Sequence, residues 1–342
     1  MTNGQSGTIP ARTILVTGGG GFLGAAIVRQ LVQRGDTVRS LSRNTYPELA
    51  ELDVEQVQGN ISNAKTVMTA CRGVDAVIHA AAKAGVWGKY ADYHGPNVQG
   101  TKNVVAACAE IGIPALVHTS SPSVIFDGND MEGIDESHPY PAVFHTHYTK
   151  TKAMAEQYVK AAAYSGRIKA VILRPHLIWG PGDPHLVPRV IERAKKLARV
   201  GKTDKLVDTI YIDDAASAHV LAADRLAENP SLSGNIYFIS QGEPVYMIDM
   251  LNGILAAAGL PPTTRTLPAG FVWLAGAVLE GAYTALGIKK EPPMTRFVAK
   301  ELATAHWFDI RAARRDLGFQ PEHTIEEGLK KLEEWLKASG GT

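Results

Sequence analysis

Cysteine is scarce in this chain, and charge of one sign does not accumulate. Only Cys71 and Cys108 occur, and neither lies in a C-x-x-C or metal-ligand spacing, so the sequence indicates no metal site and suits a reducing cytoplasm. The formal net charge is +1 at pH 7, so no overall field favours nucleic acid or an anionic membrane. We therefore expect no nucleic-acid partner.

The N-terminus lacks the apolar run of a signal peptide. Residues Met1 to Arg12 are polar with Gly and Pro, which predicts a flexible tail and a cytoplasmic protein. The 342 residues suffice for one large or two modest domains, and an apolar content of 45% is typical of a globular protein with a core.

An uninterrupted membrane-spanning run is also missing, although one segment comes close to it. Residues 271–288 are apolar apart from Glu280, Tyr283 and Thr284, and two lysines follow. A spanning helix needs about 20 mostly apolar residues, and a carboxylate in its middle costs about 2.5–3.5 kcal/mol. We favour a buried or pocket-lining helix, with a helix lying on a membrane surface as the alternative.

From Thr13 onward, short β-branched runs alternate with amphipathic stretches, a pattern typical of repeated βαβ units. The expected strands are 13–17, 37–42, 54–58, 76–79, 115–119 and 170–173, and the expected helices include 22–33, 64–71, 93–111 and 147–163. This order predicts an α/β fold in which residues 13–175 form a doubly wound parallel Rossmann sheet.

The alternation of strands and helices stops after Arg174, where a loop rich in Pro and Gly precedes mostly helical segments. We expect residues 176–342 to form a smaller, mainly helical C-terminal lobe that binds the substrate. Extended pieces at 209–212 and 236–239 could return to the main sheet, so the boundary near 175 is a functional one.

A glycine-rich loop joins the first expected strand to the first helix. Glycine permits a tight turn, a close approach of backbone amides to a pyrophosphate and close helix packing, and the helix N-terminus favours an anion. The strand before this loop and the helix after it support dinucleotide binding over a plain hairpin. We assign to the cofactor site Gly18, Gly20, Gly21, Phe22, Leu23 and Gly24.

The end of the second strand lacks the acidic residue that would accept hydrogen bonds from an adenosine ribose. Ser42 and Arg43 stand there instead and could bind a 2′-phosphate, which favours NADP. NAD stays open, with Arg43 stacked on the adenine. Asn60 and Ile61, after the third strand, are expected near the adenine.

Tyr148 and Lys152 are four residues apart and so share a helix face. A free tyrosine has a pKa of about 10, and a neighbouring cation would favour its phenolate for acid/base work. Without further context, such a pair would simply lie on a solvent-exposed helix face. Its position after a strand that ends in Thr119-Ser120-Ser121 argues for a catalytic pair.

Together these motifs resemble the extended short-chain dehydrogenases, over residues 13 to about 336. Further matching residues are His79-Ala80-Ala81-Ala82, Asn97 to Thr101 and Arg174 to Asp183. The resemblance implies that Tyr148 is the general acid or base, that Lys152 also binds the nicotinamide ribose, and that Ser121, with Ser120 as the alternative, orients the substrate oxygen. It further implies that Asn97 supports a proton-relay water and that the cofactor site includes Ala80, Ala81, Ala82, Lys152 and Pro175.

Three stretches resemble a narrower group: 82–88, 304–308 and 313–319. This group includes the 3β-hydroxysteroid and 4-carboxysterol dehydrogenases and, most similar in these stretches, the bacterial 2-alkyl-3-oxoalkanoate reductases. It implies NAD(P)-dependent interconversion of a ketone and a secondary alcohol on a bulky, lipid-like substrate, and family precedent implies a homodimer formed through 93–111 and 147–163. Asn60 departs from the aspartate common in the family.

A β-keto acid needs a cationic or amide-rich spot near the tyrosine and an apolar pocket beyond it. Lys83 and Arg189 are candidates for the carboxylate, although Arg189 could equally be a solvated helix charge. Trp87, Trp179 and the apolar segment after Phe271 are candidates for the hydrocarbon, the tryptophans being otherwise core or pocket-wall residues.

Two other functions use parts of the same pattern. A nucleotide-sugar epimerase or dehydratase shares fold and triad, but it would need a polar second lobe, against which the apolar 271–288 segment argues. A non-catalytic cofactor sensor shares the glycine loop but has no reason to keep serine, tyrosine and lysine together. We rank both behind the reductase.

Overall fold

The computed structural model describes residues 12–340, and its centre is a seven-stranded parallel sheet in the order β12-β7-β5-β4-β1-β2-β3. The sheet confirms the predicted α/β Rossmann fold. Its strands are β1 (Thr13–Thr17), β2 (Thr37–Ser42), β3 (Glu55–Gln58), β4 (Ala76–His79), β5 (Ala115–Thr119), β7 (Ala170–Pro175) and β12 (Ile236–Ile239).

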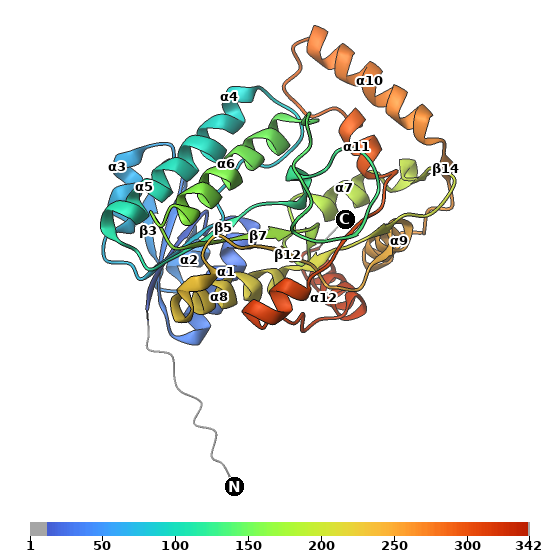
Figure 1. The fold of residues 1–342 in the computed structure, drawn as a ribbon. Helices are drawn as coiled ribbons and strands as arrows, with labels where there is room; N and C mark the ends of the chain where they lie inside the picture. Colours follow the sequence, from blue (N-terminus) through green and yellow to red (C-terminus); the bar gives the residue numbers. More distant parts are fainter. Residues whose placement is uncertain (1–11, 341–342) are drawn as a thin grey trace.

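Helices cover both faces of this sheet (Figure 1). One face carries α1 (Phe22–Arg34) and α8 (Ile212–Glu228), and the other carries α3 (Ala64–Cys71), α5 (Thr101–Ile111) and α6 (His147–Tyr164). The central strands β4, β5 and β7 are buried along their whole length, as expected for apolar strands covered on both faces.

The expected helix 93–111 is interrupted. The structure has a short helix α4 (Tyr90–Tyr93), a π-helical segment at His94–Gly100, and then α5. Pro96 lies inside the π-helical segment and has no backbone N–H to donate, which disrupts regular α-helical bonding. The irregular turn leads into α5 on the face next to α6.

A second, four-stranded sheet has the order β13-β10-β15-β6. Its strands are β13 (Val245–Tyr246), β10 (Leu206–Val207), β15 (His306–Phe308) and β6 (Met131–Ile134). Because β6 comes from the first half of the chain and pairs with β15, the two halves interlock. Residues 236–239 join the main sheet as β12, whereas β11 (Ile210–Tyr211) pairs only with β8 (Ile178–Trp179).

The remaining elements belong mainly to the second half. They are α2 (Pro47–Ala50), α7 (Leu186–Glu192), α9 (Met247–Ala257), α10 (Ala269–Ala285), α11 (Arg296–Glu301), α12 (Ile325–Ala338), β9 (Arg199–Val200) and β14 (Thr266–Leu267). Short 3-10 turns occur at Pro122–Val124, Ala194–Lys196 and Pro230–Leu232, and a second π-helical turn at Ala313–Leu317.

Helix α10, within the apolar segment, projects from the body of the molecule beside α11 (Figure 1). Only Val272 and Gly276 of α10 are buried, while Phe271 is 60%, Leu274 57% and Val278 64% exposed. Most of α10 is therefore not buried, whereas Trp273 and Glu280 on it line a cavity, which agrees with the expectation of a pocket-lining helix. Within residues 12–340, no helix is long and apolar enough to cross a membrane.

The expected N-terminal tail lies outside the described residues, except for Arg12. The backbone N–H of Arg12 donates to the Asp36 carboxylate at 3.1 Å, and its guanidinium pairs with Asp224 on α8. Arg12 is therefore anchored to the sheet's helical cover and is not part of a flexible tail.

Candidate active site

A cleft of about 750 Å³ lies at the carboxyl ends of β1, β2 and β4. In parallel α/β sheets this edge is where ligands bind. Of the residues assigned to the cofactor, the cleft is lined by Gly18, Gly21, Ser42, Arg43, Asn60, Ile61, Ala80, Ala81 and Ala82. Phe22, Leu23 and Gly24 form the first turn of α1 beside it, whereas Pro175 and Lys152 are buried beneath the carboxyl edge and do not line it.

Two glycines of the loop are required by the backbone itself. Gly18 has φ +74°, and a Cβ on it would lie 3.0 Å from the Ala81 Cα. A Cβ on Gly24 would lie 2.0 Å from the carbonyl oxygen of Gly18, so α1 can start this close to the loop only with glycine there. The loop therefore leaves a concave cradle of backbone at a helix N-terminus, which fits a dinucleotide pyrophosphate.

Residues at and just after the end of β2 form the far end of the cleft. The Ser42 hydroxyl accepts a hydrogen bond from the Gly20 N–H at 3.4 Å, and Arg43 is exposed on the cleft wall. Tyr46 also lines the cleft, and its ring lies directly over Gly20, where a Cβ would approach it to 2.1 Å. Tyr46 was missed because no motif marks it.

Helix α6 carries Tyr148 and Lys152, and the Thr146 hydroxyl caps it by accepting the Thr149 N–H at 3.0 Å. The Lys152 ammonium is buried and donates to the carbonyl oxygen of Thr119, at the end of β5, at 2.5 Å. Burial lowers the pKa of Lys152 to about 8, and the negative charge of Glu156 opposes this shift.

Tyr148 forms a hydrogen bond with Ser121, but Lys152 does not lower the pKa of Tyr148 as expected. Burial raises the pKa of Tyr148, hydrogen bonding to Ser121 lowers it, and the charge of Glu301 raises it further. The predicted lowering by Lys152 is absent among these causes because the lysine side chain runs to Thr119. The Tyr148 phenol therefore keeps its proton at neutral pH and is poised to donate it.

The position of Ser121 distinguishes it from its neighbour. Ser121 caps a 3-10 turn, with its hydroxyl 2.9 Å from the Ser123 hydroxyl, and is partly exposed. Ser120 is buried (4% exposed), and its N–H donates to the Leu173 carbonyl at 2.6 Å. Ser121 is thus the serine that the structure brings to the Tyr148 phenol.

Three buried histidines lie around Lys152, and sequence reasoning named only His79, as part of a matching stretch. Burial lowers the pKa of His79 to about 3 and that of His219 to about 4, and the Lys152 charge adds to both effects. His118 packs against His79 with the two rings tilted and their centroids 5.3 Å apart, and burial and the Lys152 charge also lower its pKa well below its usual value. At neutral pH the three imidazoles are therefore uncharged, and Lys152 is the cation among them.

The Asn97 side chain holds the loop after β4. Its oxygen accepts the Lys83 N–H at 2.7 Å, and its amide donates to the Lys83 carbonyl at 3.2 Å and to the Thr151 hydroxyl at 3.1 Å. The backbone carbonyl oxygen of Asn97 accepts a hydrogen bond from the Thr101 hydroxyl at 2.7 Å. These bonds make Asn97 a positioning residue for the cofactor-side loop, and its support of a relay water stays a prediction.

A second cavity of about 670 Å³ lies next to the start of α6. It is lined by Val86, Trp87, Gly88, Phe144, His145, Thr146, His147, Lys150, Trp273, Glu280, Thr295, Arg296, Phe297 and Lys300. Trp87 donates its indole N–H to the Ile288 carbonyl at 3.2 Å, which ties the loop after β4 to the end of the α10 segment. Its aromatic side chains suit a hydrocarbon chain, but Lys150, Glu280, Arg296 and Lys300 add charged groups to the walls.

The other candidate substrate residues have different fates. Arg189 on α7 pairs with Glu291 at 2.9 Å, and Lys83 lines the cofactor cleft, with its ammonium 5.3 Å from the Tyr93 ring centroid. Trp179 is wrong as a substrate residue: it is 0% exposed and donates its indole N–H to Thr209 at 3.1 Å. It packs in the core against Tyr211.

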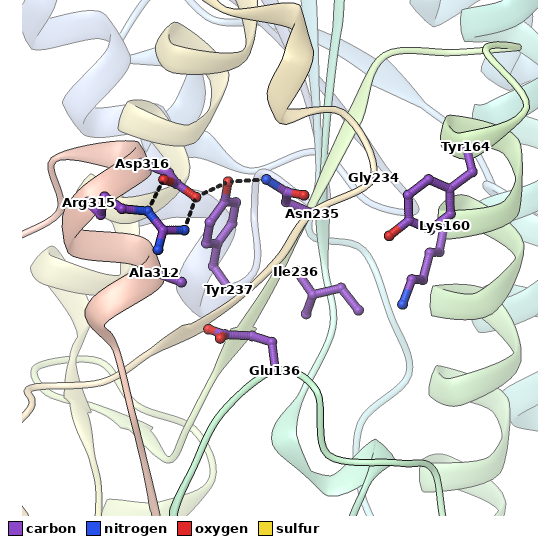
Figure 2. Close-up of a pocket in the computed structure, with 10 residues that line it drawn as sticks. All are labelled: Glu136, Lys160, Tyr164, Gly234, Asn235, Ile236, Tyr237, Ala312, Arg315 and Asp316. Carbon is purple, nitrogen blue, oxygen red and sulfur yellow. Dashed lines mark hydrogen bonds and ion pairs between the residues drawn. The ribbon is translucent and has the colours of Figure 1, made fainter.

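A smaller pocket, of about 250 Å³, lies at the amino end of β12, away from these groups (Figure 2). Figure 2 shows Asp316 between Arg315 and Tyr237, paired with the first at 2.6 Å and accepting from the second at 3.2 Å. Because these polar groups satisfy one another far from the carboxyl edge of the sheet, this pocket is no candidate for the catalytic site.

Residues 15–269 match the 3-beta hydroxysteroid dehydrogenase/isomerase family. The chain belongs to this family. The assignment confirms the resemblance read from the motifs and the predicted class, an oxidoreductase that acts on CH–OH groups.

Relatives with known names align with nearly the whole chain. A 2-alkyl-3-oxoalkanoate reductase of Shewanella oneidensis is 52% identical over 93% of this chain and 84% of that protein. Another, of Stenotrophomonas maltophilia, is 47% identical over 93% of this chain and 98% of that protein. A sterol-4-alpha-carboxylate 3-dehydrogenase of Schizosaccharomyces pombe is 33% identical over 96% and 98% of the two chains.

Solved structures share the fold at lower identity. The UDP-glucuronic acid 4-epimerase of Bacillus cereus, in complex with NAD, superposes with a TM-score of 0.74 over 96% of this chain and 99% of that one, at 22% identity. At this identity the likeness shows the fold alone.

Proposed function

We propose that the chain is an NAD(P)H-dependent ketoreductase that interconverts a 2-alkyl-3-oxoalkanoate and its 3-hydroxy acid. The observation that carries the proposal is the pair of relatives of that name, 52% and 47% identical across 93% of the chain. The aromatic side chains of Trp87, Trp273 and Phe297, which line the cavity at the start of α6, support a hydrocarbon-bearing substrate. In this proposal residues 176–342 supply the substrate lobe.

The chemistry follows from the neighbours of Tyr148. A bound nicotinamide supplies the hydride to the ketone carbon. Tyr148 donates the phenol proton to the ketone oxygen, and its raised pKa keeps that proton available at neutral pH. Ser121 donates a preorganised hydrogen bond to the same oxygen. Lys152 holds positive charge beneath the site, at the carbonyl end of β5.

We infer NADP rather than NAD as the cofactor. Arg43 and Ser42 lie at the end of β2 on the cleft wall, and the cleft offers no carboxylate at that position. A guanidinium binds a 2′-phosphate by charge-assisted hydrogen bonds, which a ribose hydroxyl cannot match. NAD, which is bound in the similar epimerase structures, is the alternative.

Three further parts of the proposal concern the environment of the enzyme. The exposed apolar face of α10, followed by Lys289 and Lys290, supports peripheral contact with an anionic membrane. Family precedent supports a homodimer through α5 and α6. Two free, buried cysteines, Cys71 and Cys108, suit a reducing cytoplasm.

The test is an assay of purified protein for NADPH and NADH oxidation with a 2-alkyl-3-oxoalkanoate, together with the reverse assay on a 3β-hydroxysterol and its 4-carboxy form. Turnover of the keto acid establishes the proposal. Turnover of the sterols alone keeps the mechanism and moves the substrate. Silence on all of them rejects the ketoreductase and makes a nucleotide sugar the next substrate to assay.

A further inference from the structure

The cavity at the start of α6 has three walls, which come from distant parts of the chain: the loop after β4, the residues around the first turn of α6, and α10 with α11. The Trp87 indole N–H donates to the Ile288 carbonyl at 3.2 Å, so the loop after β4 is tied to the segment that follows α10. On α11, Phe297 packs edge-to-face on the buried Phe126, with ring centroids 5.8 Å apart. The aromatic walls are therefore held in place by contacts outside the cavity.

The cavity is lined by segments that also build the catalytic site. Residues 80–84 of the loop after β4 line the cofactor cleft, and residues 86–88 of the same loop line the cavity. Thr146 and His147, which also line the cavity, directly precede Tyr148 at the start of α6. A ligand in the cavity therefore lies against the loop that borders the cofactor and against the helical turn that carries the phenol.

Charged side chains give the cavity a positive excess. Its lining contains Lys150, Arg296 and Lys300 but only one carboxylate, Glu280, which leaves a local charge of +2 with the histidines counted as neutral. Glu280 neutralises Arg296, whose Nε donates to it at 2.6 Å and whose backbone N–H donates at 2.8 Å. The two lysines make no ion pair within residues 12–340, and the Lys150 ammonium lies 5.7 Å from the Tyr90 ring centroid instead. The cavity therefore attracts an anion.

The Lys300 ammonium is placed to contact such an anion. Its side chain is half-buried, and its Nζ lies in the space that a Cβ on Gly128 would fill. The same Cβ would lie 3.1 Å from His145 Nε2, so the two side chains meet there. His145 Nε2 donates to the Asp127 carbonyl at 2.9 Å and so has no lone pair for the ammonium. His145 therefore leaves the N–H donors of Lys300 available to a ligand.

We propose that this cavity binds an alkyl carboxylate, with the carboxylate at Lys300 and the alkyl chain along Trp87 and Trp273. A carboxylate and an ammonium form a charge-assisted hydrogen bond, and aromatic walls remove an alkyl chain from water. Two ligands have this chemistry, the 2-alkyl-3-oxoalkanoate and a simple long-chain fatty acid. The assignment to the keto acid rests on the proposed function, and it makes Lys300 the specificity-determining residue for the acid end of the substrate.

Tryptophan fluorescence measures this binding without turnover. Two of the five tryptophans, Trp87 and Trp273, line the cavity, and bromine atoms quench a tryptophan that they contact. Stearate brominated in mid-chain should therefore quench the emission saturably, and Trp87→Phe with Trp273→Phe should remove most of that quenching. Trp335→Phe, on α12 and outside the cavity, is the control and should leave the quenching in place.

Lysine variants test the carboxylate contact. Lys300→Gln should weaken binding of the brominated acid at least about tenfold and binding of the corresponding brominated alcohol less than about threefold, because only the acid is an anion. Lys150→Gln removes the same charge from the lining without removing the contact, so it should weaken acid binding less than Lys300→Gln does. Binding of the alcohol reports that each variant is folded.

Competition and kinetics distinguish the two ligands. If the keto acid is the ligand, it should displace the brominated acid at least about tenfold more strongly than plain stearate does, and Lys300→Gln should raise its KM at least about tenfold while changing kcat less than about threefold. Equal or stronger displacement by stearate, or an unchanged KM, overturns the assignment to the substrate and supports a fatty-acid site.

Absence of saturable quenching, or quenching that survives the double tryptophan change, overturns the inference. So do equal losses for the acid and the alcohol in Lys300→Gln, or equal losses of acid binding in Lys300→Gln and Lys150→Gln. Failure of the enzyme to reduce the keto acid, with binding of the brominated acid intact, is a different result, since it rejects the proposed function and leaves a fatty acid as the ligand of the cavity.

Discussion

The Glu156 carboxylate on α6 and the Arg174 guanidinium on β7 form a bidentate ion pair, at 2.5 and 3.0 Å, with side chains 0% and 1% exposed. The Tyr140 hydroxyl donates to the same carboxylate at 2.6 Å. Because Lys152 lies one helical turn before Glu156, this pair fixes the catalytic helix to the strand whose end borders the site.

We expect Glu156→Gln to lower the free energy of unfolding by about 3–5 kcal/mol, because it leaves a buried guanidinium without its counter-ion. Thermal or denaturant unfolding measures this. The matched control is Glu228→Gln, which removes one partner of an exposed pair with Arg225 and should cost less than about 1 kcal/mol. Equal losses in the two variants would show that the buried pair does not hold α6 on the sheet.

The approach of Gly18 to Ala81 predicts a second stability difference. Gly18→Ala and Gly73→Ala both place an alanine at positive φ, +74° and +70°, which costs about 1–2 kcal/mol. Only the first also pushes a Cβ to 3.0 Å from a backbone atom, since Gly73 has nothing within 4 Å. Gly18→Ala should therefore be less stable than Gly73→Ala and should weaken NADPH binding at least tenfold, measured by fluorescence titration. Equal cofactor affinity would place the pyrophosphate elsewhere.

Sequence patterns predicted the sheet well because its strands are short, buried and β-branched. The bounds of β1, β2, β4 and β5 agree with expectation. The pairing of β6 with β15 could not be foreseen, since two strands of three or four residues, some 175 positions apart, carry little local signal. Pro96 marks the break before α5 in the sequence, although the expected helix 93–111 runs across it.

The candidate site shows the same division between motif and side-chain geometry. The glycine loop and the Ser121–Tyr148–Lys152 set lie where their motifs imply, because backbone conformation and helix spacing place them. The direction of the Tyr148 pKa shift was wrong, because helix spacing does not reveal that Lys152 turns to Thr119. The positions of Glu301, His118 and His219 come from long-range packing, which no local pattern encodes.

The proposed cofactor preference predicts the behaviour of an Arg43 variant. Arg43→Ala should lower kcat/KM for NADPH by about 10- to 100-fold, by loss of a charge-assisted pair with the 2′-phosphate, and change kcat/KM for NADH less than about threefold. Steady-state assays with both cofactors measure this, with Arg72→Ala, an exposed arginine at the end of α3, as the control. An equal loss for both cofactors would mean that Arg43 stacks on the adenine instead.

The proposed membrane contact predicts an effect of two exposed side chains on α10. Phe271→Ser with Leu274→Ser should reduce binding to vesicles containing phosphatidylglycerol at least tenfold, since each large apolar side chain contributes about 1.5–3 kcal/mol on burial. Because both are more than half exposed, the unfolding temperature should not fall. Tyr164→Ser, at an equally exposed position on α6, is the control. Vesicle binding that is undetectable, or unaffected by the α10 changes, rejects the contact.

Tyr148→Phe tests the catalytic assignment most directly. It removes the phenol proton but keeps the ring, so kcat should fall by at least about 10²- to 10⁴-fold while NADPH affinity stays within a few-fold. Tyr158→Phe makes the same change on the same helix, where the hydroxyl accepts only a 3.4 Å bond from Arg167, and should leave kcat unchanged. Ser121→Ala should give a smaller loss of kcat, about 10-fold or more, because it removes the hydrogen bond to the carbonyl oxygen but not the proton donor. If Tyr148→Phe keeps most of its activity, the proton comes from another group, and Tyr93, whose charge is coupled to that of Tyr148, becomes the residue to change next.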